Sequence, residues 1–333
     1  MPATRCLKWF SRLRPNGSDK SGLNMNDLRQ FLGTLPHKGL LGVLLVAWVA
    51  LFHLLGNSSF GYIDTPSLFV WLQALYDANP DDALGYVVLP LVAVLIYRQR
   101  DDFMPLAKRP WGPALVLLGL ALVLHFAGFL IQQARVSLVA FCLGLFALTC
   151  LMWGPAWMRK SAYPFALLAF VVPITAYTDG LTFHLRLLVT KIAAGFCTVV
   201  LNLSLIREGT TVFHLLPDGS RGFEFDVAPA CSGIRSLTVV FLLAMVVGYI
   251  WLAAWWRRGA LLLAALPLAL LGNIVRLITV FVVGESQGSE AGLAIETKLG
   301  FITFLVALGG VWLLARWLSD LPSEPVQTQE EKP

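Results

Sequence analysis

The chain has 333 residues, of which 57% are hydrophobic and 14% charged, and its formal net charge is +5. A soluble globular protein carries about 25% charged residues, so this composition excludes a water-soluble domain. The basic residues lie at the ends of apolar runs and form no block dense enough for nucleic acid, which indicates orientation in a membrane instead. We therefore predict an all-α polytopic membrane protein.

A polar, basic stretch over residues 1–38 has no signal-peptide core, so we predict a cytoplasmic N-terminal tail. Apolar runs follow it, and a helix that spans a bilayer needs roughly 20 such residues. The candidate runs cover residues 39–55, 83–97, 113–130, 136–153, 163–177, 187–206, 236–256, 261–283 and 300–317.

The number of spans follows from the basic pairs Arg159/Lys160 and Arg257/Arg258, which both belong on the cytoplasmic side. Three runs lie between them, and an even number is required. The segment 181–206 is the weakest, because it carries Arg186 and Lys191, and a charge at the bilayer centre costs about 2.5–3.5 kcal/mol on insertion scales. We predict about eight transmembrane helices and one amphipathic interfacial helix. A tilted span with Lys191 facing the bundle interior is the alternative.

This topology places the loop 207–235 on the outer face. Its segments 210–216 and 221–227 are rich in strand-favouring residues and flank Pro217-Asp218-Gly219-Ser220. Proline presets φ and glycine accepts positive φ, so this sequence is typical of a turn. We predict a short β-hairpin on the outer face, and a disordered C-terminal tail over residues 319–333.

Cys231 directly follows the hairpin, in Ala228-Pro229-Ala230-Cys231-Ser232-Gly233-Ile234-Arg235, where the next span begins. The positive end of a helix dipole and the charge of Arg235 favour the thiolate form, so Cys231 can be a nucleophile. A small cysteine packed beneath the hairpin is the alternative. The five cysteines form no CxxC pair, so we expect no metal site and no cofactor.

Arg276 follows Asn273 inside an otherwise apolar run, toward the same outer face. An arginine there requires an internal partner or a water-filled cavity, and its guanidinium could stabilise the oxyanion of an acyl-transfer intermediate. An arginine that snorkels to the outer headgroups is the alternative. The expected outer loop 285–298 carries three carboxylates: Glu285 and Glu290 read as solvated, whereas Glu296 could act as a base or orient Arg276.

The Cys-Ser-Gly-Ile-Arg-Ser motif, the Asn-x-x-Arg motif at residues 273–276 and the Gly-Phe element at residues 300–301 resemble the exosortase/archaeosortase family, over residues 163–317. The resemblance implies a multi-spanning cysteine transpeptidase that recognises a C-terminal sorting signal on exported proteins, made of a short motif, a hydrophobic helix and a basic tail. It also implies that Cys231 is the nucleophile, Arg276 the essential arginine and Arg235 a supporting residue.

The sequence departs from the family at Glu296, where the family has a histidine four positions before the glycine of its last motif. A carboxylate can accept the thiol proton but cannot form a thiolate-imidazolium pair, so His214 or His184 could substitute. Ser232, Asn273 and His214 complete the predicted supporting residues.

The resulting prediction divides the chain into the tail, N-terminal transmembrane helices over 39–160, an exosortase-like catalytic region over 161–318 and the C-terminal tail. The predicted function is a plasma (inner) membrane cysteine protease or transpeptidase, with its active site on the outer or periplasmic face, that transfers exported proteins to a lipid or glycan acceptor. A transporter or lipid-handling protein, and an inactive scaffold of the same fold, are the alternatives.

Overall fold

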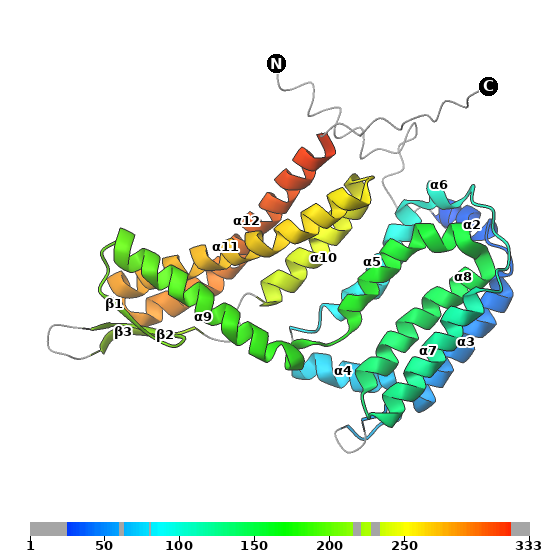
Figure 1. The fold of residues 1–333 in the computed structure, drawn as a ribbon, viewed down its shortest axis with the longest axis horizontal. Helices are drawn as coiled ribbons and strands as arrows, with labels where there is room; N and C mark the ends of the chain where they lie inside the picture. The colour runs from blue at the N-terminus through cyan, green and yellow to red at the C-terminus, as the bar shows by residue number, and fades with distance from the viewer. Residues whose placement is uncertain (1–24, 60–62, 80, 216–220, 228–233, 321–333) are drawn as a thin grey trace, which may run out of the picture. The chain divides into compact units, whose positions relative to one another are not determined.

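The computed structural model of the chain describes residues 25–59, 63–79, 81–215, 221–227 and 234–320 (Figure 1). They belong to two compact units, one within Met1–Leu68 and Pro90–Phe165 and the other within Phe69–Leu89 and Ala166–Pro333. Most of residues 1–38, the hairpin turn and nearly all of the expected C-terminal tail lie outside the described residues.

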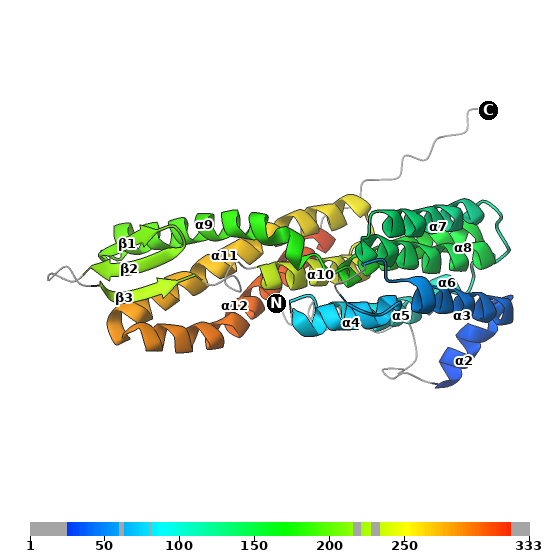
Figure 2. The same cartoon turned by 90° about the horizontal axis from the view of Figure 1, so that it is seen from below.

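The first unit is a helical bundle in which α3 (Lys38–Leu55), α7 (Ala114–Leu130) and α8 (Ala134–Ala166) lie side by side (Figures 1 and 2). Trp48 of α3 donates its indole N–H to the Phe141 carbonyl of α8 at 3.1 Å. His125 of α7 is buried against Phe52 and lies 3.1 Å from the Ser137 hydroxyl of α8. These contacts give His125 a structural role. The unit also contains α2 (Met25–Gly33) and α6 (Arg100–Phe103).

Helix α8 consists of two helical segments joined at Gly154, which has φ +85° and ψ −175°. A side chain there would be strained, and its Cβ would lie 2.9 Å from the Arg109 carbonyl oxygen. The second segment carries Lys160, which forms an ion pair with Asp102 at 2.8 Å. Helix α8 therefore continues beyond the expected run 136–153.

The second unit contains α4 (Leu68–Ala78), the 3₁₀ helix η1 (Leu167–Val171), α9 (Thr175–Val200), α10 (Ile234–Trp251), α11 (Trp255–Gln287) and α12 (Ser289–Asp320). Helix α5 (Gly85–Arg98) begins in this unit and ends in the first. Helices α10, α11 and α12 pack through small and branched side chains, including Val240, Ala265 and Val311. Close packing of small residues is the usual way that helices associate in a bilayer.

A three-stranded antiparallel sheet follows α9, in the order β1 (Leu205–Glu208), β2 (Thr211–Leu215) and β3 (Arg221–Asp226). The predicted hairpin is confirmed, because β2 pairs with β3 in the register Thr211↔Asp226 and Val212↔Phe225. Strand β1 was not predicted. The apolar run that was expected to reach residue 206 ends as a helix at Val200, and Asn202 then takes the left-handed conformation with φ 54°.

Four helices among the described residues are long and apolar enough to cross a membrane: Lys38–Leu55, Ala134–Val171, Phe183–Val200 and Trp255–Gln287. Shorter apolar helices cover Gly85–Arg98, Ala114–Leu130, Leu237–Trp251 and Phe304–Ser319. The chain is therefore a mostly helical integral membrane protein with a small sheet.

The expected run 163–177 is not one continuous helix. It is divided between the end of α8, η1 and the start of α9, with Val172 in an extended conformation. Val172 precedes Pro173, and a residue before proline is disfavoured in the helical region. Proline also lacks the N–H that would continue the helix. The break between η1 and α9 therefore follows from the sequence.

Candidate active site

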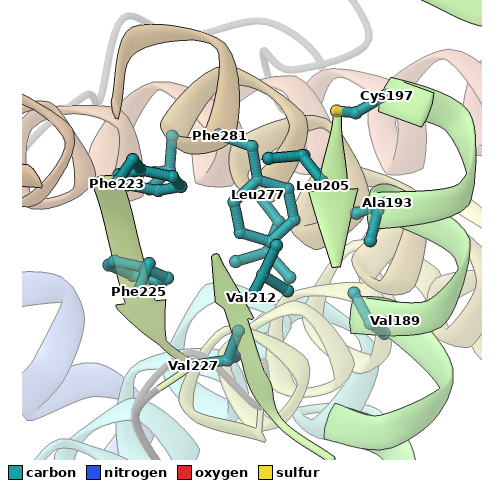
Figure 3. Close-up of a cluster of buried hydrophobic side chains, with 12 residues drawn as sticks. Val189, Ala193, Cys197, Leu205, Val212, Phe223, Phe225, Val227, Leu277 and Phe281 are labelled. Atoms are coloured by element: carbon teal, nitrogen blue, oxygen red, sulfur yellow. The ribbon is translucent and has the colours of Figure 1, made fainter. Parts of the chain in front are cut away.

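The sheet shares one buried cluster with α9 and α11 (Figure 3). Helix α9 contributes Val189, Ala193, Ala194 and Cys197, the strands contribute Leu205, Val212, Phe223, Phe225 and Val227, and α11 contributes Leu277, Val280 and Phe281. Alternation explains the β3 members, since Phe223 and Phe225 are buried while their neighbours Glu224 and Asp226 are exposed. The part of α11 that packs against the sheet is therefore the part that carries Leu277, Val280 and Phe281.

Three contacts hold the C-terminal end of α11 to the sheet. The Phe223 ring packs so closely on Gly284 that a Cβ there would overlap it. The Glu224 backbone N–H donates to the Ser289 hydroxyl at 3.3 Å, and His214 Nδ1 is paired with the carboxylate of Glu285. We call these three contacts the sheet clasp. They join Phe223, Glu224 and His214 to the end of α11 and the start of α12.

The expected outer loop 285–298 is wrong. Helix α11 continues to Gln287, Gly288 turns the chain with φ +91°, and α12 begins at Ser289. Gly292 of α12 approaches α11 so closely that a Cβ there would lie 3.2 Å from the Gly284 Cα atom. The sheet and this close helix contact explain why polar residues beyond the apolar run remain helical. Glu285, expected to be solvated, is instead the partner of His214.

Arg276 lies on α11 two turns before Gly284, in the buried part of the helix. Its side chain is 9% exposed, and its Nε and Nη2 atoms have no hydrogen-bond partner among the residues that the structure describes. Asn273, one turn earlier, is 5% exposed. A guanidinium buried in this way differs from one that extends to the headgroups, because its charged donors remain available for an internal ligand.

Arg186 of α9 contacts the residue that follows β3, and this contact was not predicted from the sequence. Its Nη1 atom donates to the Val227 carbonyl oxygen at 3.4 Å, and its guanidinium lies 5.5 Å from the centre of the Phe183 ring. In the sequence, Arg186 was interpreted only as a charge that opposes membrane insertion. Its helical spacing with the buried residues Val189, Thr190 and Ala193 was the available signal that it lies on the packed face.

The structure describes the remaining predicted site residues only in part. Cys231 and Ser232 lie outside the described residues, in the segment 228–233 that joins β3 to α10. The backbone of Arg235 lies in the first turn of α10 and that of Glu296 in α12, and their side chains are not described. Val227, which leads into the Cys231 segment, is held by its N–H bond to the Thr210 carbonyl oxygen at 3.2 Å.

The fold and the buried arginine together define a class of protein. A helical membrane protein carries a small sheet that packs on α9 and α11, and an arginine of α11, Arg276, is buried. No group of three metal-ligating side chains occurs within the described part of the chain.

A comparison with known protein families identifies the family of this chain. Residues 71–313 match the model of the transmembrane exosortase (Exosortase_EpsH) family, and the chain belongs to this family. The match covers more than half of the chain and begins earlier than the resemblance at residues 163–317. No significant match was found among curated proteins or among solved structures. Exosortases are cysteine transpeptidases, so membership supports a membrane transpeptidase kind of function.

Proposed function

We propose that the chain is a membrane-embedded cysteine protease and transpeptidase. It cleaves the C-terminal sorting signals of exported proteins and transfers the new C-terminus to a lipid or glycan acceptor of the cell envelope. The observation that carries the proposal is Arg276, a buried guanidinium with unpaired donors on the helix that flanks the sheet leading to Cys231, in a member of the exosortase family.

In this mechanism the Cys231 thiolate adds to the scissile carbonyl carbon, and Arg276 donates hydrogen bonds to the oxyanion that forms. Glu296 takes the thiol proton and returns it to the leaving amine as the C–N bond breaks, which leaves a thioester on Cys231. The Glu296 carboxylate then takes the proton of a nucleophilic group of the acceptor, which attacks the thioester carbonyl. The C–S bond breaks, and the proton on Glu296 returns to the Cys231 sulfur, which restores the starting state.

The supporting residues act on these three groups. The Arg235 charge favours the Cys231 thiolate, and Ser232 and Asn273 supply further hydrogen-bond donors. His214 acts through the sheet clasp and not as the base, because its partner Glu285 lies nine residues beyond Arg276. At about 1.5 Å per residue that is about 13.5 Å along the helix axis.

We place the active site on the outer face of the plasma (inner) membrane, with about eight spans and α9 in the interface. The exposed charged residues of the sheet support this, since open strand edges do not occur in lipid. Helix α9 packs Val189, Ala193 and Cys197 against this sheet, so its second half lies at the depth of the sheet. The substrate helix would then enter laterally from the lipid, which aligns its scissile bond with Cys231 before the reaction.

The test maps the C-termini of exported proteins by mass spectrometry in native cells that carry each variant in place of the wild-type copy. We expect processed C-termini in wild-type cells and their loss in Cys231→Ser. Arg276→Gln should slow processing by about 100–1000-fold, the usual cost of removing one oxyanion donor. Cys142→Ser is the matched control, because Cys142 is a free, half-buried thiol of α8.

Processed C-termini that persist in Cys231→Ser cells would contradict the proposal. A transporter or an inactive scaffold predicts that outcome, since neither requires the thiol.

A further inference from the structure

The end of α10, the start of α11 and the end of α12 lie together at one end of these three helices (Figure 1). Arg257 of α11 donates through Nη1 to the Leu318 carbonyl oxygen in the last turn of α12 at 3.1 Å. Arg258 donates through Nε to the Leu252 carbonyl oxygen, directly after α10, at 2.8 Å. These two hydrogen bonds join the start of α11 to the ends of the other two helices.

A third arginine, Arg316 of α12, belongs to the same end. Its guanidinium lies 5.7 Å from the centre of the Trp312 ring, and that ring packs against Trp251 of α10 with 6.4 Å between the ring centres. Trp251 directly precedes Leu252, the residue that Arg258 caps. The structure therefore brings three guanidinium groups from two helices to the end of α10. We call these three residues the basic patch: Arg257, Arg258 and Arg316.

The positive charge of the basic patch exceeds what the helix ends require. A helix C-terminus carries a charge of about −0.5 and a helix N-terminus about +0.5, so the two C-termini and the one N-terminus here offset only about half a positive charge. Asp320 is the one acidic residue in the sequence of residues 249–258 and 312–320. With three arginines, this end of the helices keeps a net charge of about +1.5.

Three tryptophans beside the basic patch have exposed rings. Trp255 is 83% exposed, Trp256 50% and Trp317 60%. The first two directly precede Arg257, and Trp317 follows Arg316. Tryptophan is enriched at the membrane–water interface, so this end of the helices lies at the depth of the lipid headgroups. An anionic headgroup at that depth supplies the negative charge that complements the basic patch.

We propose that the basic patch is a binding surface for the headgroup of an anionic membrane lipid, bordered by the exposed tryptophan rings. Arg257 and Arg258 also cap helix ends, whereas the Arg316 guanidinium makes no hydrogen bond among the described residues. Arg316 is therefore the residue whose replacement removes lipid binding without removing a cap. The inference does not depend on the proposed function, because it involves none of the residues of the transfer reaction.

The experiment titrates short-chain phosphatidylglycerol into the full-length protein in a non-ionic detergent and counts bound lipid by native mass spectrometry. Phosphatidylcholine of equal chain length is the control lipid, because it carries the same phosphate but no net charge. We expect the wild-type protein to bind phosphatidylglycerol more tightly than phosphatidylcholine. Arg316→Gln should weaken phosphatidylglycerol binding by about fivefold, the usual contribution of one basic side chain near an anionic membrane surface. Arg316→Lys retains the charge and should bind as the wild type does.

Arg207→Gln is the matched control variant, because Arg207 is an exposed arginine of β1 that contacts the Gly209 carbonyl oxygen. It should leave phosphatidylglycerol binding unchanged. Thermal unfolding of each variant identifies a protein that has failed to fold, and the comparison of Arg316→Lys with the wild type then carries the test. Equal affinity of Arg316→Gln and Arg207→Gln for phosphatidylglycerol would overturn the proposal. Phosphatidylcholine that binds the wild type as tightly as phosphatidylglycerol would also overturn it.

Discussion

Replacing Gly284 by alanine tests the sheet clasp. Alanine is a better helix former than glycine by about 0.5–1 kcal/mol, so the change would stabilise an unobstructed helix. Here the new methyl group overlaps the Phe223 ring. That ring is 6% exposed and is hemmed in by Phe225 and Phe281, whose ring centres each lie 6.4 Å away. Overpacking of a buried site costs about 1–3 kcal/mol.

Gly309→Ala is the matched control, because a methyl group on Gly309 of α12 would meet no atom within 4 Å. Both variants gain the same helix propensity, so the difference between them isolates the overlap. We expect Gly284→Ala to be less stable than Gly309→Ala by about 2 kcal/mol. The free energy of unfolding is measured by titrating mixed micelles with SDS.

A double variant tests whether the Phe223 ring is the group that the new methyl group overlaps. Phe223→Leu removes part of the ring, so Gly284→Ala should cost less in that background than in the wild type. Equal stability of Gly284→Ala and Gly309→Ala would refute the clasp geometry. An unchanged cost in the Phe223→Leu background would refute the role of this ring.

Two other predictions concern the polar groups of the sheet and the site. His214→Ala leaves the half-buried Glu285 carboxylate without its partner, so we expect a loss of about 1–2 kcal/mol; an unchanged unfolding temperature would show that the pair contributes nothing. Glu296→Gln removes the proposed base and should slow C-terminal processing by about 100-fold, whereas Glu296→His restores the residue type of the family and should retain activity. Full processing in Glu296→Gln cells would exclude Glu296 as the base.

The parts of the fold that local sequence determines were predicted correctly. Pro217-Asp218-Gly219-Ser220 between two alternating segments predicted the β2–β3 hairpin, which is confirmed. Strand β1 was missed because Leu205 and Ile206 continue an apolar run without interruption. Only pairing with β2 makes them strand residues, with Leu205 opposite His214, and pairing partners are not encoded in apolar periodicity.

The C-terminal end of α11 was missed for a different reason. Glycine and polar residues over 285–298 are typical of a loop, but the helices extend beyond the apolar run and pack on the sheet through Phe281 and Gly284. The polar residues are helical because tertiary contacts stabilise the hairpin of α11 and α12. A single sequence contains no signal for that contact.

In the candidate site too, features that depend on local sequence were predicted and features that depend on tertiary contacts were not. A lone arginine in an apolar run predicted a buried polar site at Arg276, and the structure buries that side chain. The contact between Arg186 and Val227 joins residues 41 positions apart, so no local pattern could reveal it. The roles of Cys231, Ser232, Arg235 and Glu296 stay predictions from motif and family.

The central claim is that Cys231 is an activated nucleophile on the outer face, and its alkylation rate tests this most directly. Intact cells are treated at neutral pH with a membrane-impermeant maleimide, and each cysteine peptide is quantified by mass spectrometry over time. We expect Cys231 to react faster than Cys142 and the buried Cys150, which serve as controls in the same molecule. Cys231 that reacts only after permeabilisation, or no faster than Cys150, would contradict the account.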